Sequence, residues 1–364
     1  MDVKVFYMKY LFIIQGEGRG HMTQAMTLEN LLRKNGHEVV KMIVGRSPNR
    51  KLPDFFVNGV HAPIIQIESM NFMPSASNRR PSMFKTVIFN TFHVLKFIPS
   101  IRRIRDEIRS SGADVVVNFY ELMAGMTYLF HRMDTPMVCV GHQYLFLHKD
   151  FGLPRAKYPG SHALDFFSRM TSIGASKKLA LSFRAMEPDG KRKIRVVPPL
   201  LREEVLGISP VKGEYIHGYL LNSGFAEDVR QWHKANPDKE LHFFWDNWDA
   251  GKVLKEDDKL YFHLIDDKEF LKMMSGCAAF ASTAGFESVC EAMYMGKPIL
   301  MVPSHIEQEV NAFDAMRSGA GVTCDRFDLS LLIEFAETFS PDTSFRHWVN
   351  SASEIIIREL ETVE

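Results

Sequence analysis

The chain has 364 residues, more than one typical domain, which favours two domains of roughly 150–200 residues each. Hydrophobic residues make up 46% and charged residues 24%, the balance of a globular protein with a full core. The 44 basic residues balance the 44 acidic ones. A chain without net charge has no overall attraction to polyanions, so we expect no nucleic-acid partner.

Short apolar strands alternate with helical segments along the first half, the pattern of parallel α/β units. We predict strands at Tyr10–Ile14, His37–Ile43, Asp114–Asn118, Pro136–Val140 and Thr171–Gly174. We predict helices at His21–Lys34, Phe84–Arg109 (broken near Pro99) and Glu121–Met133.

A glycine-rich turn, Gly16–Gly20, joins the first strand to the helix that starts at His21. Such a turn lets backbone amides approach an anion at the helix start. Its GxGxG spacing is not the GxGxxG of dinucleotide-binding proteins, and the end of the second strand offers Lys41, Gly45 and Arg46 in place of an acid. No Gly-Lys-Ser/Thr follows, so the Walker pattern is also excluded.

His21 is our first choice for a catalytic base. The positive end of the helix dipole disfavours imidazolium, and a neutral ring suits removal of a proton from a substrate hydroxyl. The alternative is a histidine that merely caps its helix. Glu121 and His142 each follow a predicted strand and are rival bases, and Glu121 could instead orient His21. Their structural alternatives are a helix cap for Glu121 and a loop role for His142.

The stretch Val196–Gly213 holds three prolines and two glycines and is typical of an interdomain connection. The strand–helix alternation then restarts. We predict strands at Tyr215–Leu221, Leu241–Trp245, Leu260–His263, Ala278–Ala281, Ile299–Val302 and Gly321–Thr323. We predict helices near Ala226–Lys234, Asp267–Met274, Gly285–Met295, Gln308–Arg317 and Leu329–Thr338, with a last one at about Phe345–Glu361.

The segment Ser282–Gly321 carries the second set of candidate residues. A small-residue turn at Ala284–Phe286 opens a helix, where free amides suit a diphosphate. Glu291 lies one to two turns further on, where a carboxylate can accept from two ribose hydroxyls. Glu307 and Gln308 follow the next strand and can bond sugar hydroxyls. Each could be an ordinary polar residue by itself, but their joint spacing favours a nucleotide-sugar site.

These patterns predict an α/β fold with two doubly wound, parallel-sheet domains, separated by a cleft that the carboxyl ends of both sheets line. We expect the first domain at residues 1–198 and the second at residues 199–340. Residues 341–364 are expected to form a C-terminal helix that packs back towards the first domain.

No apolar run approaches the ~18 residues of a membrane-spanning helix, and Tyr10–Ile14 is too short for a signal-peptide core. Met8 would itself serve as a start, so we expect Met1–Tyr7 to be dispensable. The cysteines stand singly, which favours reduced thiols in a cytoplasmic protein over disulfides or a zinc site. They are Cys139, Cys277, Cys290 and Cys324.

With these motifs the sequence resembles the GT-B glycosyltransferases over most of its length, particularly the lipid-linked N-acetylglucosaminyltransferase of peptidoglycan synthesis and macrolide-type transferases. The loop ending in His21 looks like the family's first-domain loop, whose histidine is a proposed base. The resemblance implies that Arg202, in "LLREEVL", reaches the donor diphosphate and that the backbone of Ile265, in "IDD", meets uracil. The residues on the family's donor-site motif are Gly285, Glu291, Gln308 and Asn311.

The sequence departs from the peptidoglycan enzyme in two places. Glu307 stands where that enzyme has a second glutamine, which leaves the donor sugar open. Glu17 and Arg19 stand where that enzyme usually has small residues, so we expect a different acceptor at the Gly18 and Gly20 loop.

No two aspartates are separated by a single residue, so a DxD metal clamp is absent, and we expect neither a metal nor another cofactor. Helix amides near Ala284–Phe286, the turn around Ser223 and Gly224, and Arg202 would stabilise the leaving diphosphate. A base on the opposite side of the anomeric carbon would give direct displacement with inversion.

From Arg79 to Arg109 the chain has eight basic residues against two acids, with apolar residues between them. This suits an interfacial segment on anionic lipid, or an entrance for a lipid-linked glycan acceptor. A core helix with a solvated basic face is the alternative. The sequence thus predicts a cytoplasmic glycosyltransferase that associates peripherally with the membrane; a non-hydrolysing nucleotide-sugar epimerase and a non-catalytic nucleotide- or glycan-binding protein are the rival functions.

Overall fold

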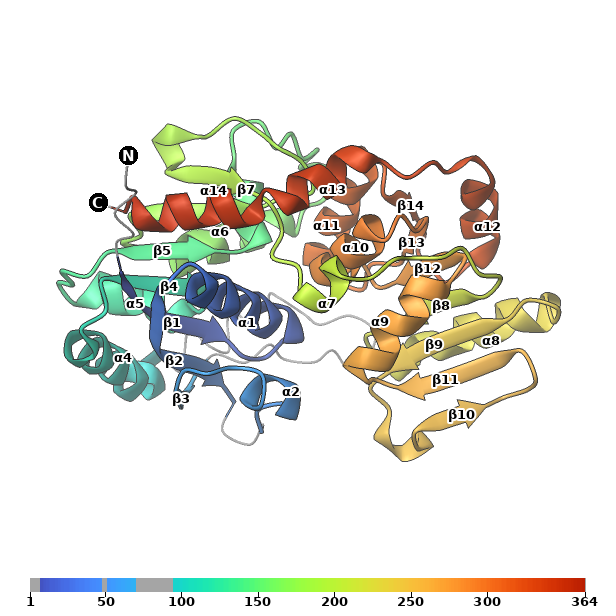
Figure 1. Ribbon diagram of the computed structural model, residues 1–364, viewed down its shortest axis with the longest axis horizontal. Coiled ribbons are helices and arrows are strands. Elements are labelled where there is room, and N and C mark those ends of the chain that lie inside the picture. The colour runs from blue at the N-terminus through green and yellow to red at the C-terminus, as the bar shows by residue number, and fades with distance from the viewer. Residues whose placement is uncertain (1–6, 48–50, 70–93, 364) are drawn as a thin grey trace. The chain divides into compact units, whose positions relative to one another are not determined.

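The computed structural model describes residues 7–47, 51–69 and 94–363. The described residues up to Leu200, together with those from Trp348 onward, form one compact unit, and Leu201–His347 form a second. Each unit is built on a seven-stranded, largely parallel sheet with helices packed on it (Figure 1). The predicted α/β fold is therefore confirmed.

In the first unit the sheet order is β3-β2-β1-β4-β5-β6-β7, with every pairing parallel. Strand β1 is fully buried from Tyr10 to Ile14, as a central parallel strand covered on both faces must be. The strands are β1 (Lys9–Gln15), β2 (Glu38–Arg46), β3 (Ile64–Glu68), β4 (Val115–Phe119), β5 (Met137–Val140), β6 (Lys177–Leu181) and β7 (Ile194–Val197).

Helix α4 of the first unit buries one apolar face. In α4 the buried positions are Ser100, Ile101, Ile104 and Ile108, a spacing of three to four residues. The helices are α1 (Arg19–Lys34), α2 (Asp54–Val57), η1 (Val94–Phe97), α4 (Ile98–Ser111), α5 (Leu122–Phe130), η2 (His142–Leu147), α6 (Ser161–Thr171), η3 (Gly190–Arg192) and α14 (Ala352–Glu361).

Helix α14 returns to the first unit from the far end of the sequence. It packs against α1 and β7, and Lys177 Nζ pairs with Glu359 Oε2 at 2.8 Å. His37 Nε2 lies 3.1 Å from Glu361 Oε1, and just before the helix Trp348 Nε1 donates to the Ser182 carbonyl at 2.9 Å.

In the second unit the sheet order is β10-β11-β9-β8-β12-β13-β14. All pairings are parallel except that of β10 with β11, a short antiparallel edge hairpin. The strands are β8 (Ile216–Tyr219), β9 (Leu241–Trp245), β10 (Val253–Lys255), β11 (Leu260–Leu264), β12 (Ala279–Ser282), β13 (Ile299–Met301) and β14 (Gly321–Thr323).

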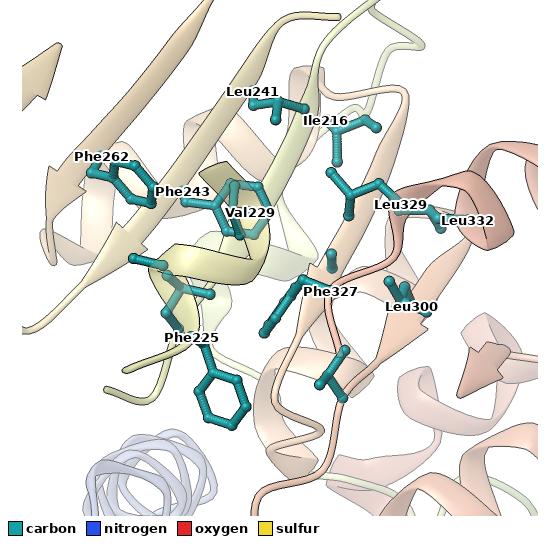
Figure 2. Packing of buried hydrophobic residues seen from close by; sticks show 14 of the residues in the cluster. Ile216, Phe225, Val229, Leu241, Phe243, Phe262, Leu300, Phe327, Leu329 and Leu332 are labelled. Atoms are coloured by element: carbon teal, nitrogen blue, oxygen red, sulfur yellow. The ribbon is translucent and has the colours of Figure 1, made fainter. Parts of the chain in front are cut away.

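The core of the second unit forms where α8 and the segment before α12 cover the sheet. Figure 2 shows Val229 beside Phe243 of β9, and the ring of Phe225 meets that of Phe327 edge to face at 5.7 Å. The rings of Phe243 and Phe327 meet edge to face at 5.7 Å. The helices are α7 (Glu203–Leu206), η4 (Ser223–Phe225), α8 (Ala226–Ala235), η5 (Trp248–Ala250), α9 (Asp267–Gly276), α10 (Phe286–Tyr294), α11 (Ile306–Arg317) and α12 (Leu329–Thr338), and α13 spans Thr343–Asn350.

Two sequence-based predictions are wrong. Thr171–Gly174 is not a strand: it ends α6 and turns at Gly174 (φ +77°), and the strand follows at Lys177. The last helix is not continuous but divides at Ser351 into α13 and α14.

Part of a third prediction can be compared with the structure. Residues 84–93 of the predicted Phe84–Arg109 helix lie outside the described residues. The rest divides near Pro99, as predicted: η1 ends at Phe97, and α4 begins at Ile98 with Pro99 in its first turn, where a backbone N–H has no intrahelical partner.

Candidate functional site

Each sheet reverses its strand order at one point. In each unit the candidate residues lie at the carboxyl ends of the strands next to this reversal point. In the first unit this point lies between β1 and β4, and in the second between β8 and β12. Open α/β sheets bind ligands at such points. A non-glycine residue with left-handed backbone follows the strand in each unit: Tyr120 (φ +62°) after β4 and Ala284 (φ +60°) after β12. Such strained residues cluster at functional sites.

The glycine-rich loop follows β1, and its glycines have different roles. Gly16 packs on β2, because a Cβ there would lie 2.5 Å from Arg46 Cγ. Gly18 is the N-cap of α1, and a Cβ there would meet nothing within 4 Å, so the backbone is open to a ligand. Gly20 lies in the first turn of the helix. The side chain of Glu17 closes the loop onto β2 by accepting from the Ser47 amide at 2.7 Å.

His21 lies in the first turn of α1, as predicted, and is held from three sides. Its Nδ1 lies 3.3 Å from Gln24 Oε1, and its Nε2 lies 3.5 Å from Gln143 Nε2. The Tyr120 ring stacks on it at 5.6 Å. Burial lowers the pKa of His21 to about 4, so the ring is neutral at pH 7. Of these partners only Gln24, three residues on along the same helix, had a signal in the sequence.

Glu121 is the N-cap of α5 and is completely buried. Its Oε1 accepts from Ser69 Oγ at 2.5 Å and from the Met123 amide at 2.9 Å. Burial raises its pKa to about 7. The hypothesis that Glu121 orients His21 by direct contact is wrong, because Gln24 occupies that position. Glu121 Oε2 instead faces Gly45, where a Cβ would lie only 2.1 Å away.

His142 starts η2 and lies in the aromatic core of the first unit. Its Nδ1 donates to the Leu181 carbonyl at 2.7 Å, and its ring meets Phe146 and Phe183 edge to face. It is 2% exposed, so the structure favours the structural alternative over a base at the rim.

In the second unit the turn after β12 opens α10. The Ala284 amide donates to Ser282 Oγ, and Asn311 Nδ2 donates to the Ala284 carbonyl, both at 3.2 Å. Gly285 is the N-cap and has no side chain to cap the helix that begins at Phe286. A Cβ at Gly285 would meet only Ser288 Oγ, at 3.6 Å, so the helix start is open to an anion.

Arg202 and Glu291 form a buried ion pair. Arg202 Nε and Nη2 donate to Glu291 Oε1 at 3.0 and 2.6 Å. Burial raises the pKa of Glu291 above its ordinary value, and Arg202 opposes that rise. The resemblance implies separate contacts of these residues with diphosphate and ribose, but the structure joins them directly.

The other predicted donor residues lie on the same carboxyl edge. Gln308 Oε1 accepts from the Ser304 amide and hydroxyl at 2.9 and 2.7 Å, which turns its carbonyl inward. Glu307, half-buried, is the second residue of α11. The Ile265 amide donates to the Trp245 carbonyl at the end of β9. Ser223 and Gly224 form η4 after β8, where the Gly224 amide donates to the Asn222 side chain.

A cavity of about 660 Å³ lies elsewhere in the second unit. Ala278 and Pro298, which line it, precede β12 and β13, so it borders the amino ends of the strands and not the candidate site. Lys297, also on its wall, donates to three carbonyls, those of Val211, Ser275 and Cys277.

Among residues 7–47, 51–69 and 94–363, no three histidine, cysteine, aspartate or glutamate side chains group so that they could hold a metal ion. The helices of the same residues include none long and apolar enough to cross a membrane.

Comparison with known proteins agrees with the fold. A family model described as Glycosyl transferase family 1 matches residues 8–339. The glycosyltransferase of kitacinnamycin is 16% identical over 97% of this chain and 99% of that chain, with a TM-score of 0.63. CalG4, the calicheamicin glycosyltransferase, is 15% identical over 98% of both chains, with a TM-score of 0.64. UGT2 of Phytolacca americana, solved with UDP-2fluoro-glucose and pterostilbene, is 12% identical over 98% of this chain and 99% of that chain, with a TM-score of 0.63. Comparison with curated proteins finds no match.

Proposed function

This chain belongs to glycosyl transferase family 1, and from that premise we propose that it is an inverting, metal-independent enzyme that moves a sugar from a uridine diphosphate sugar to a hydroxyl acceptor. The observation that carries the proposal is the open start of α10 on the same edge as the buried Glu291 carboxylate. The helix start suits the diphosphate, and the carboxylate suits the ribose hydroxyls. UGT2, which has the same fold, was solved with a uridine diphosphate sugar.

His21 would act as the base. Its neutral ring accepts the proton of the acceptor hydroxyl while the hydroxyl oxygen bonds to the anomeric carbon. The bond from that carbon to the diphosphate oxygen breaks with its electron pair, and attack from the opposite face inverts the configuration. The α10 dipole and the Ser223–Gly224 turn stabilise the negative charge that leaves.

The direct test is thermal denaturation with uridine diphosphate. We expect the nucleotide to raise the melting temperature with a chelator present, since the proposed diphosphate site needs no cation. Glu291→Ala should abolish most of the shift, whereas Glu256→Ala, at an exposed ion pair of the same unit, should keep it. Equal shifts in wild type and Glu291→Ala, or a strict magnesium requirement, would contradict the proposal.

An assay without acceptor separates the rival functions. An epimerase would convert the nucleotide sugar into its isomer with no acceptor, and a binding protein would leave it unchanged under all conditions. The proposed transferase releases uridine diphosphate only when a hydroxyl acceptor is supplied.

For the acceptor we keep the lipid-linked glycan as a proposal, with peripheral association with anionic membranes. The apolar stripe of α4 is buried, while Arg102 and Arg103 on its other face are exposed, so this part of the segment offers charge rather than apolar insertion. Sedimentation with anionic vesicles, at low and high salt, tests this. Protein that stays in the supernatant at low salt would indicate a soluble acceptor.

A further inference from the structure

The ion pair of Arg202 and Glu291 is asymmetric in a way that leaves one carboxylate oxygen available. Both guanidinium hydrogen bonds go to Oε1. No donor in the described part of the chain reaches Oε2. The Glu291 side chain is only 4% exposed, but Oε2 is not fully enclosed, so a ligand hydroxyl can reach this acceptor.

The charges around Glu291 show why the partner matters. Burial is the largest influence and favours the protonated acid. Asp267, 3.9 Å from Arg202, and Glu204 add negative charge that acts in the same direction. Arg202 opposes all three. Without Arg202, the pKa of the Glu291 carboxyl group would rise further.

A second ion pair in the same unit has nearly the same geometry but is more exposed. Arg230 Nε and Nη2 donate to Glu256 Oε1 at 2.9 and 2.6 Å, and both side chains are about one-third exposed. Solvent screens that pair, so its loss should change little. Burial, and not hydrogen-bond geometry, therefore distinguishes the Arg202 pair.

We propose that Arg202 is a positioning residue for the donor ribose: its two hydrogen bonds hold Oε1 of Glu291, so that Oε2 can accept the ribose hydroxyls. The inference rests on the proposed function and deepens it. This role can be distinguished from a direct contact of Arg202 with the diphosphate. If Arg202 acts through Glu291, its loss weakens the binding of uridine and of uridine diphosphate alike, whereas loss of a diphosphate contact weakens only the binding of uridine diphosphate.

Calorimetric titration with uridine and with uridine diphosphate tests the difference. In Arg202→Gln we expect both affinities to fall by the same factor, about 10-fold or more at pH 7. The pH at which uridine binding is half lost should rise by about 1–3 units. Arg202→Lys, which keeps the charge, should restore most of the wild-type pH profile.

Two control variants complete the test. Arg230→Gln should bind both ligands as the wild type does, and Arg202→Gln/Glu291→Gln should bind uridine weakly with no pH dependence between pH 5 and 8. Loss of uridine diphosphate affinity with uridine affinity unchanged would overturn the inference in favour of a diphosphate contact. If the wild type binds neither ligand, the proposed function fails and the inference with it.

A ligand-free measurement covers the case in which Arg202→Gln binds both ligands too weakly for calorimetry. Carboxyl NMR of ¹³C-glutamate protein, with Glu291→Gln for assignment, follows the titration of Glu291 directly in Arg202→Lys and Arg202→Gln. A higher pKa of Glu291 in Arg202→Gln than in Arg202→Lys supports the inference, and equal values overturn it.

Discussion

The carboxyl edges of the two sheets share a plan but differ in charge. Each has a strained, left-handed residue after the strand beside the reversal point, Tyr120 in the first unit and Ala284 in the second. Around Tyr120 lie a neutral histidine and a carboxyl group whose pKa burial raises to about 7. Near Ala284 lie an open helix start and a buried ion pair. The same topology thus provides one edge suited to moving a proton and another suited to holding an anion.

The difference comes from how each edge handles buried titratable groups. In the first unit the side-chain partners are neutral, Gln24 and Gln143 for His21 and Ser69 for Glu121, so burial shifts the pKa of each group in favour of its neutral form. In the second unit a full positive charge faces the carboxylate. Hydrogen bonds from neutral partners do not offset the effect of burial on a titratable group, whereas an opposite charge favours the ionised form of that group.

The largest expected effect is at the neutral edge. His21→Ala should lower turnover by roughly 10²–10⁴, the usual span for loss of a general base, while affinity for uridine diphosphate stays near wild type. His162→Ala, an exposed histidine of the same unit, is the matched control. Steady-state kinetics measures the turnover, and calorimetry measures the affinity for uridine diphosphate. Full activity in His21→Ala combined with loss in Glu121→Ala would exchange the two roles.

A smaller effect is expected in the pH dependence of folding. The pKa of Glu121 rises from 4.5 to about 7 on folding, so the unfolded state ionises first and this group costs stability as pH rises through that window. The unfolding free energy of Glu121→Gln, relative to that of the wild type, should therefore rise by about 3 kcal/mol between pH 4 and pH 8. Urea unfolding across pH measures it, with exposed Glu354→Gln as control. A pH-independent difference would mean that Glu121 is ionised in the fold.

The smallest effect concerns the strained turn of the charged edge. Ala284→Gly relieves a left-handed backbone that costs about 1 kcal/mol or more, and loses a buried methyl worth about 0.8 kcal/mol. Its unfolding free energy should stay within about 0.5 kcal/mol of wild type. Ala292→Gly, inside α10 and equally buried, should cost about 2 kcal/mol, because it loses a similar methyl and because glycine is unfavourable in a helix. Equal losses in both variants would show that Ala284 carries no strain.

Much of the second unit was predictable from local pattern alone. Leu241–Trp245, Gly321–Thr323 and Leu329–Thr338 have the predicted bounds, because apolar runs or helical periodicity end at clear polar or turn residues. The edge strand β10 has no such run, since an exposed strand buries little. In the first unit, the strand predicted at Thr171–Gly174 is a turn at the end of α6, because Gly174 has a left-handed backbone, and β6 forms further on at Lys177–Leu181.

The site was predictable as far as chemistry follows from neighbours in sequence. The GxGxG loop placed His21 at a helix start, and the spacing in Ser282–Gly321 placed Glu291 near an open helix start. Contacts between distant residues could not be predicted. Gln143 is 122 residues from His21, and Arg202 is 89 from Glu291, so only the folded sheets bring them together.

The return of α14 to the first unit has a consequence for folding during synthesis. Leu201–His347 is continuous, so the second unit can complete its sheet as soon as it leaves the ribosome. The first unit must wait for Trp348 and α14, which at about 5–20 residues per second arrive roughly 7–30 s after Leu200. During that interval the surface of α1 and β7 that α14 covers is exposed. The unit that begins first is thus finished last, and chaperones have that interval in which to bind it.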